Sequence, residues 1–175
     1  VPTQGPLILA ANHSSYLDPP LVGAALPRLV VMLARRSLFR FPGFGRLLRL
    51  WHTVPVDTES GSAAALKTIL QRLASRYAVL VFPEGSRSFD GRLQPARAGI
   101  GLVVLKSQAP LVPVRIWGTH EAYGRGIRFP RPLRVTVKFG RPLLFREERE
   151  EAACCSKPRL KEICQSVADH IMAEI

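Results

Sequence analysis

LILAANHSSYLD, residues 7–18, is the most informative part of this 175-residue chain for its fold class. Its first part, residues 7–11, is a short continuous apolar run of the kind that forms a buried strand. Its second part is polar and puts a histidine, His13, two residues after the end of that strand. Because sites in α/β sheets gather at the carboxyl ends of strands, residues 12–18 are expected at a functional edge.

Further short apolar runs predict strands elsewhere, and helical patterns lie between them. The expected strands cover residues 29–33, 78–82, 111–117 and 133–139, and the expected helices cover a face at 66–73 starting near 60–62, residues 98–107, and a C-terminal helical region at 145–175 that breaks near Pro158. Strands separated by helices imply parallel pairing through right-handed crossovers. We therefore predict one α/β domain over residues 1–175, with a mixed, mostly parallel sheet flanked by helices.

The chain is strongly basic, with a formal net charge of +12. Anionic lipid, nucleic acid and phosphorylated substrates are all possible partners of such a surface. Residues 28–49 concentrate this character, because they hold six arginines, no acidic residue and the aromatic residues Phe39, Phe41 and Phe44. The mixture suits an anionic membrane surface, although a solvated basic face or single-stranded nucleic acid would also fit it.

No run approaches the ~18 apolar residues of a membrane-spanning helix. The chain opens on Val1 and Pro2 and enters an apolar run by Leu7. We expect that an N-terminal membrane-anchoring segment is missing from this sequence.

The first polar constellation pairs His13 with Asp18. An aspartate five residues on can return across a tight turn and accept the imidazole Nδ1–H, which leaves Nε2 free to take a proton. The nucleophile would then be a hydroxyl of the substrate. The alternative is that Asp18 only caps a helix beginning at Pro19 and Pro20.

The second polar constellation is FPEGSRS, residues 82–88, at the end of another predicted strand. A glycine-containing turn can present backbone N–H groups, and Arg87 can grip a phosphate with two parallel hydrogen bonds. Glu84 is expected either to orient Arg87 or to bind a substrate hydroxyl. The alternative is an ordinary turn carrying a surface ion pair.

Together, Asn-His-x-x-x-x-Asp and Phe-Pro-Glu-Gly-Ser-Arg-Ser about seventy residues later resemble the glycerophospholipid acyltransferase family, closest to its 1-acylglycerol-3-phosphate acyltransferases. Two weaker segments are also similar to family blocks: residues 34–38 with 42–45, and residues 111–114. The resemblance covers roughly residues 5–120. It implies a glycerolphosphate acyltransferase-like fold.

The resemblance also implies roles for individual residues. His13 would be the catalytic base, Asp18 its support, and Arg35 a contact to the acceptor's phosphate. The turn would contact the phosphate and glycerol of the acceptor through Glu84, Gly85, Ser86 and Arg87. The sequence departs from the family at Thr58, where an arginine commonly follows Asp57, so Arg97 or an arginine within 35–49 is expected to substitute.

The implied reaction moves a fatty acyl group from acyl-CoA or acyl carrier protein to 1-acylglycerol 3-phosphate, giving phosphatidate. The implied setting is the cytoplasmic face of a membrane, and we expect neither a cofactor nor a metal. Glycerol 3-phosphate or another lysolipid is the alternative acceptor. Two rivals remain: a catalytically inactive lipid-binding domain, and a basic nucleic-acid-binding module. The latter leaves His13, Asp18 and residues 84–88 unexplained, so we do not expect nucleic acid as a partner.

Overall fold

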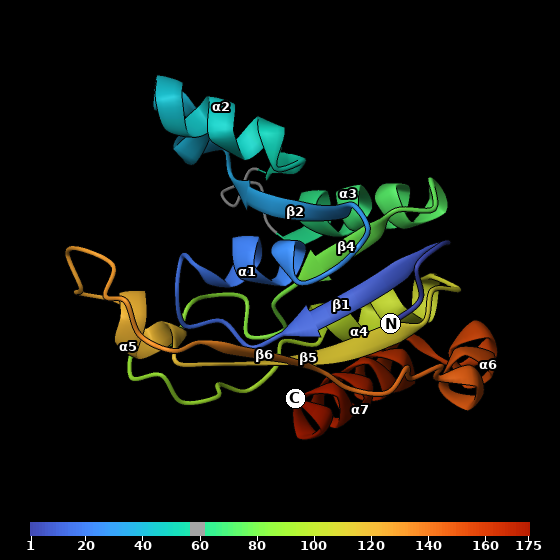
Figure 1. Ribbon diagram of the computed structural model, residues 1–175. Coiled ribbons are helices and arrows are strands. Elements are labelled where there is room, and N and C mark those ends of the chain that lie inside the picture. The colour runs from blue at the N-terminus through green and yellow to red at the C-terminus, as the bar shows by residue number, and fades with distance from the viewer. Residues whose placement is uncertain (57–61) are drawn as a thin grey trace.

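A computed structural model describes residues 1–56 and 62–175 and contains one six-stranded sheet (Figure 1). The strand order is β3-β2-β4-β1-β5-β6, and all neighbours are parallel except β5 and β6. The strands are β1 (Leu7–Ala11), β2 (Val30–Arg35), β3 (Thr53–Val56), β4 (Ala78–Val81), β5 (Leu111–Trp117) and β6 (Thr136–Phe139). The predicted mixed, mostly parallel α/β sheet is confirmed.

Helices connect most of the strands and also form the C-terminal part of the chain. They are α1 (Asp18–Ala24), the 3-10 helix η1 (Arg36–Arg40), α2 (Pro42–Leu50), α3 (Ser62–Ala74), α4 (Gly99–Lys106), α5 (Thr119–Tyr123), α6 (Arg146–Cys154) and α7 (Lys157–Glu174). In the described part of the chain, no helix combines the length and the apolar character needed to cross a membrane.

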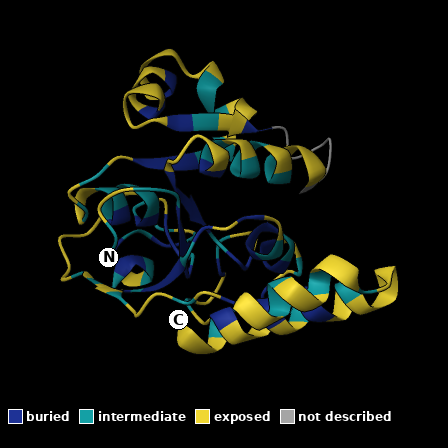
Figure 2. Cartoon of the chain, turned by 90° about the vertical axis from the view of Figure 1, so that its right-hand side faces the viewer, coloured by how far each residue is buried: buried dark blue, intermediate teal, exposed yellow. Residues whose placement is uncertain are grey.

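The sheet separates two apolar clusters, because successive strand side chains point to opposite faces. On one face, Ile8 and Ala10 pack with residues of α3, α4 and α7. On the other, Leu7, Leu9 and Ala11 pack with Val22 of α1 and with residues of β6. Figure 2 shows the strands buried in the middle, while much of α2 at the far end is exposed.

Strand β1 lies at the centre and is buried along its whole length. It pairs in parallel with β4 on one side and β5 on the other, which explains why its sequence is continuously apolar rather than alternating. The parallel pairing brings the carboxyl ends of β1, β4 and β5 to one edge. Residues 12–18, 82–88 and 118–123 therefore meet there although they are far apart in sequence.

Several boundaries differ from the prediction. The strand expected at 133–139 begins only at Thr136, and the short elements α1, α2, β3 and α5 were not predicted as such. β3 is an edge strand that contains Pro55. Proline argues against a strand in a sequence pattern, but it is tolerated in a strand at the edge of a sheet. The C-terminal break lies at Cys155 and Ser156, and Pro158 belongs to the first turn of α7, where a missing N–H costs nothing.

Two expectations lie outside the described residues. These are the departure at Asp57 and Thr58, and the start of the third helix near residues 60–61. The described part of that helix begins at Ser62.

Candidate active site

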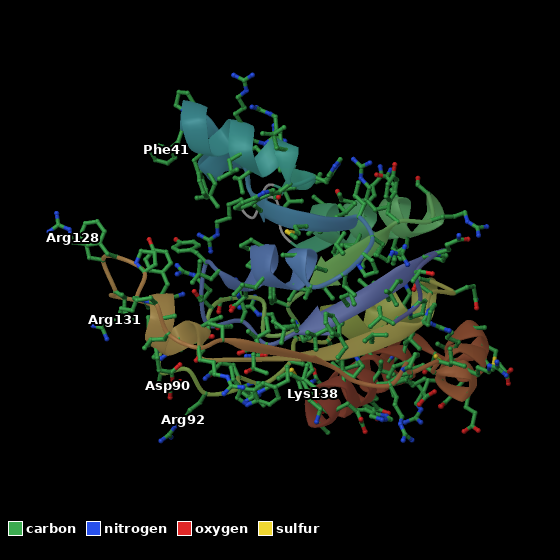
Figure 3. All side chains as sticks on the ribbon, viewed as in Figure 1. Phe41, Asp90, Arg92, Arg128, Arg131 and Lys138 are labelled. Carbon is green, nitrogen blue, oxygen red and sulfur yellow. The ribbon has the colours of Figure 1, made fainter. Side chains whose placement is uncertain are left out.

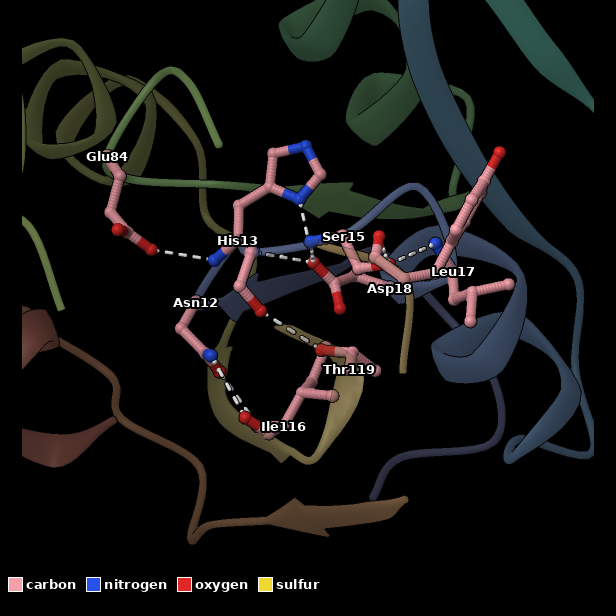
Figure 4. A network of polar contacts seen from close by, with 10 residues as sticks. Asn12, His13, Ser15, Leu17, Asp18, Glu84, Ile116 and Thr119 are labelled. Carbon is pink, nitrogen blue, oxygen red and sulfur yellow. Dashed lines mark hydrogen bonds and ion pairs between the residues drawn. The ribbon is translucent and has the colours of Figure 1, made fainter. Parts of the chain in front are cut away.

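His13 and Asp18 form a hydrogen-bonded pair at the carboxyl edge of β1. The imidazole Nδ1 lies 2.9 Å from Asp18 Oδ2, as the five-residue spacing suggested. A carboxylate oxygen accepts, so Nδ1 carries the proton and the Nε2 lone pair is available. Figure 4 shows the second ring nitrogen pointing away from Asp18.

Asp18 is fully buried, and its carboxylate organises the turn that precedes it. Its Oδ2 also accepts the backbone N–H groups of Ser14 and Ser15, each at 2.7 Å. The residue is the first of α1, yet no side chain caps that helix with a hydrogen bond. The helix-cap alternative is therefore wrong: Asp18 faces back toward His13 rather than forward into its own helix.

Glu84 holds the backbone of His13 from the other side. Its Oε1 accepts the His13 N–H at 2.6 Å, and its Oε2 accepts the Gln94 N–H at 3.0 Å. Burial raises the pKa of Glu84, while these two backbone hydrogen bonds act to lower it. In the described residues no hydrogen bond or ion pair joins Glu84 to Arg87, contrary to one sequence expectation, and both Glu84 carboxylate oxygens accept backbone N–H groups.

A third set of contacts ties the same segment to β5 and α5 (Figure 4). The Asn12 side chain donates to Ile116 O at 3.0 Å and accepts from Ile116 N at 2.7 Å. The Ser14 hydroxyl lies 3.0 Å from that of Thr119, and the Ser15 hydroxyl donates to Tyr123 O at 2.7 Å. The segment is thus fixed on three sides by elements distant in sequence.

The His13 ring itself lies on an aromatic face. It stacks on Phe82, with ring centroids 3.9 Å apart and an angle of 16° between the planes. The Ser88 N–H donates to His13 O at 2.7 Å. The imidazole is 17% exposed, so its orientation is restricted while one edge stays open to a substrate.

The turn at residues 82–88 brings two of the predicted arginines to the site. Gly85 has a φ of 73°, and a Cβ there would lie 2.7 Å from Arg97 Nε. Glycine is therefore required both for the left-handed conformation and for the close approach of Arg97. Arg87 lies over the ring of Tyr16, with Cζ 3.6 Å from the centroid.

A cavity of about 590 Å³ opens beside Phe82, between α3 and α4. Arg35, Gly85, Ser86 and Arg97 line it together with apolar residues such as Leu66 and Ile100. Four of the predicted substrate-binding residues thus share one cavity. It combines guanidinium groups with an apolar interior, which suits an amphiphile with an anionic head.

Two kinds of site residue were not found from sequence. Phe82, Asn12 and Gln94 lie in or near the recognised motifs, but nothing in the motifs indicates their contacts. Thr119 and Tyr123 lie about 105 residues from their partners and carry no sequence signal at all. Among the described residues, no cluster of three or more His, Cys, Asp or Glu side chains is placed to hold a metal ion.

Comparison with known proteins gives consistent matches. A family model described as Acyltransferase matches residues 1–117. A 1-acyl-sn-glycerol-3-phosphate acyltransferase of Limnanthes alba is 34% identical over 140 residues, covering 78% of this chain and 50% of the relative. One from Bacillus subtilis (strain 168) is 26% identical over 175 residues, covering 98% and 82%.

A solved structure is also similar. The crystal structure of the 1-acyl-sn-glycerophosphate (LPA) acyltransferase PlsC from Thermotoga maritima superposes with a TM-score of 0.75 and 25% identity, covering 99% of this chain and 68% of that one. The chain spans about half the length of the Cocos nucifera and Limnanthes relatives that it matches.

Proposed function

This chain belongs to the Acyltransferase family, and from that premise we propose that it transfers a fatty acyl group to the free hydroxyl of 1-acylglycerol 3-phosphate, giving phosphatidate. The observation that carries the proposal is the His13 imidazole, bonded to buried Asp18 and open at Nε2 beside a cavity with arginines. The names of the relatives support the same acceptor.

In the proposed reaction the acceptor is its own nucleophile. His13 Nε2 takes the hydroxyl proton as the acceptor oxygen attacks the thioester carbonyl carbon. Asp18 holds the ring and balances the imidazolium that forms. The C–S bond then breaks, and the imidazolium returns its proton to the leaving thiolate. Neither a metal nor an acyl-enzyme intermediate is needed.

The 82–88 turn offers donors for the charge that develops on the carbonyl oxygen. The Gly85 and Ser88 N–H groups already donate to Phe82 O and His13 O. No hydrogen bond within the described residues uses the N–H groups of Ser86 and Arg87. We assign these two groups the role of stabilising the oxyanion, because preorganised N–H donors are the usual means.

The acceptor's phosphate would be held by guanidinium groups around the cavity. Arg35 and Arg97 line it, and Arg87 lies on the same turn above Tyr16. These three arginines would take the role of the family arginine whose position is occupied by Thr58 in this sequence. We assign Glu84 to positioning His13 rather than to substrate binding, since its oxygens are occupied by backbone donors.

The donor is a fatty acyl thioester, either acyl-CoA or acyl carrier protein. Both are anionic, so the basic character of the chain favours either equally. The proposed site of action is the cytoplasmic face of a membrane with anionic lipid. The supporting observation is the segment of residues 41–51, where arginines alternate with exposed apolar side chains.

An acyl-transfer assay with purified protein tests the proposal. Labelled acyl-CoA and acyl carrier protein would each be offered with 1-acylglycerol 3-phosphate, glycerol 3-phosphate and a neutral lysolipid. We expect transfer to 1-acylglycerol 3-phosphate that is lost in His13→Ala. Transfer only to one of the other acceptors would keep the chemistry and overturn the acceptor assignment.

A further inference from the structure

The loop between α5 and β6, residues 124–135, is the second basic surface of the molecule. It carries Arg125, Arg128, Arg131 and Arg134, and no acidic residue occurs anywhere from 122 to 146. All seven residues from Arg128 to Arg134 are exposed. The motifs of the active site do not include this loop, so its composition is unexplained by the reaction.

Exposed apolar side chains accompany these arginines. Phe129 is 71% exposed and Leu133 49%, and Phe89, which the loop contacts, is 76% exposed. The Arg125 guanidinium lies 3.8 Å from the centroid of the Phe89 ring, and that of Arg128 lies 5.6 Å from Phe129. Large apolar side chains in water next to cations are typical of a surface that enters a lipid headgroup region.

The loop arginines form no ion pairs with acidic residues in the described part of the chain. Within residues 1–56 and 62–175, no ion pair joins any of the four to Asp or Glu, whereas Arg159 on α7 binds both Glu151 and Glu162. The loop backbone is nevertheless braced, because Arg131 N donates to Ala122 O and Ile127 N to Gly124 O. Pro130 and Pro132 restrict it further. A fixed backbone therefore displays unpaired cations.

The loop borders the active site. It starts next to Tyr123, whose carbonyl accepts the Ser15 hydroxyl and whose ring lies 6.3 Å from that of Tyr16. The 41–51 segment also begins near this edge, after β2 and η1. Figure 3 shows Phe41, Arg128 and Arg131 projecting on the side of the molecule toward which β1 points in Figure 1.

We propose that the 124–135 loop and the 41–51 segment form a two-sided docking face for an anionic bilayer, with the opening at His13 between them. The proposal rests on the proposed function, because docking there would present a lipid acceptor to the site. Charge complementarity favours an anionic partner. The exposed Leu50 and Leu133 favour lipid over nucleic acid, because a leucine side chain offers bases no stacking surface.

Vesicle binding of the whole chain tests the loop. The probe is a vesicle of equal parts phosphatidylglycerol and phosphatidylcholine, with pure phosphatidylcholine for comparison. We expect Arg128→Gln/Arg131→Gln to weaken binding to the anionic vesicle by about 10- to 30-fold, since a basic residue near such a surface contributes about five-fold. Phe129→Ala should weaken it by about ten-fold or less through lost apolar burial.

Matched variants outside the face serve as controls. Lys157→Gln/Lys161→Gln on α7 makes the same charge change, and Leu144→Ala removes an exposed apolar side chain elsewhere. Both should bind anionic vesicles within about two-fold of wild type, unless only total charge matters. Equal losses in the loop and α7 double variants would overturn the proposal, as would wild-type vesicle binding by the loop variants.

Activity separates this proposal from the proposed function. The loop variants should lose transfer to 1-acylglycerol 3-phosphate presented on anionic vesicles and keep transfer to a short-chain acceptor dissolved below its aggregation limit. If the wild type acylates no acceptor while the loop variants still lose vesicle binding, the docking face is supported and the proposed function fails. Binding of single-stranded DNA that depends on the loop, without binding to anionic vesicles, would overturn the lipid assignment.

Discussion

Residues 12–18 follow β1, and residues 41–51 follow β2 after the short helix η1, so both lie beyond the carboxyl ends of parallel strands. They nevertheless differ in almost every physical respect. In the first segment Asp18 is fully buried and three donors converge on its Oδ2. In the second, Phe41 and Leu50 are 64% and 69% exposed, and of α2 only Gly45 and Leu48 are buried. Hydrogen bonds hold the first segment in one geometry. The second segment is distinguished by its basic and apolar composition, and most of its side chains are not buried.

The difference follows from what each segment is proposed to contact. Proton transfer needs atoms held within a fraction of an ångström, so residues 12–18 are clamped by Glu84, Ile116 and Tyr123. A bilayer is a soft partner that accepts many side-chain arrangements. Substitutions of the fully buried Asp18 in the first segment should therefore damage activity and stability together, whereas those in the second segment should affect binding alone.

The largest expected effect is that of His13→Ala. Removing a general base that works with an orienting partner typically lowers turnover by ~10²–10⁴-fold or more. The fold should survive, because the loss of the Phe82 stack costs only about 1 kcal/mol. Acyl transfer and circular dichroism on the same preparation would check both parts. A folded variant with normal turnover would refute the base role of His13.

Asp18→Asn should be the next most damaging change, and it should also destabilise the fold. An amide can stabilise the wrong imidazole tautomer through its NH2 group and, being neutral, cannot balance an imidazolium, so we expect a loss of about 10²-fold or more in turnover. If the amide oxygen takes the place of Oδ2, the NH2 group takes the place of Oδ1, which is buried without a partner, and such an unsatisfied donor should cost about 1–3 kcal/mol of unfolding free energy. Urea unfolding and kinetics would measure the two losses. An effect on turnover without one on stability would break the coupling proposed for this segment.

Glu84→Gln tests whether Glu84 positions His13 rather than binding substrate. The amide can accept only one of the two N–H bonds, so we expect turnover to fall about ten-fold with little change in KM for the acceptor, and stability to fall by about 1–3 kcal/mol. Glu174→Gln, an exposed change near the chain end, is the control. A raised KM with unchanged turnover would return Glu84 to substrate binding.

The pH dependence of stability gives a second readout at Glu84. Burial raises its pKa in the folded state, so the folded protein binds more protons than the unfolded one just above the ordinary glutamate pKa. That contribution to stability is present below the unfolded pKa and is lost as pH rises through the folded pKa. Glu84→Gln should remove this slope from a plot of unfolding free energy against pH.

Arg87→Lys should have a smaller and more selective effect. Lysine keeps the charge but not the planar grip, so we expect about a ten-fold loss of kcat/KM with a phosphate-bearing acceptor. An acceptor without phosphate should show no such loss. Arg92→Lys, on an exposed arginine beside Asp90, is the control. Equal losses with both acceptors would mean that the contact of Arg87 with Tyr16, rather than phosphate binding, matters.

The smallest effects on the folded protein should come from the 41–51 segment. Phe41→Ala with Leu50→Ala should weaken binding to anionic vesicles by about ten-fold, since apolar area no longer enters the interface. Thermal unfolding should be unchanged, because both side chains are largely exposed. A clear drop in melting temperature would show that these residues pack in the fold, and the contrast between the two segments would fail.

Much of the fold was predictable because strand patterns are local. The run at residues 7–11 and the alternation of strands and helices were enough for a mostly parallel α/β sheet, and β1 and β5 have the predicted bounds. The elements missed were short or unusual, such as the edge strand β3 with its proline and the short helix α5. Their stability comes from neighbours, which a sequence pattern does not record.

The five-residue spacing predicted the His13–Asp18 bond as one of two possibilities, because a tight turn can bring an aspartate at that spacing back to the imidazole. What holds that turn in place depends on how the strands pair. Glu84 and Ile116 reach it because β1 pairs with β4 in the register Ala10↔Val81 and with β5 in the register Ala11↔Val114. A contact across strands depends on register and crossover geometry, and neither is encoded in the spacing of the residues that meet.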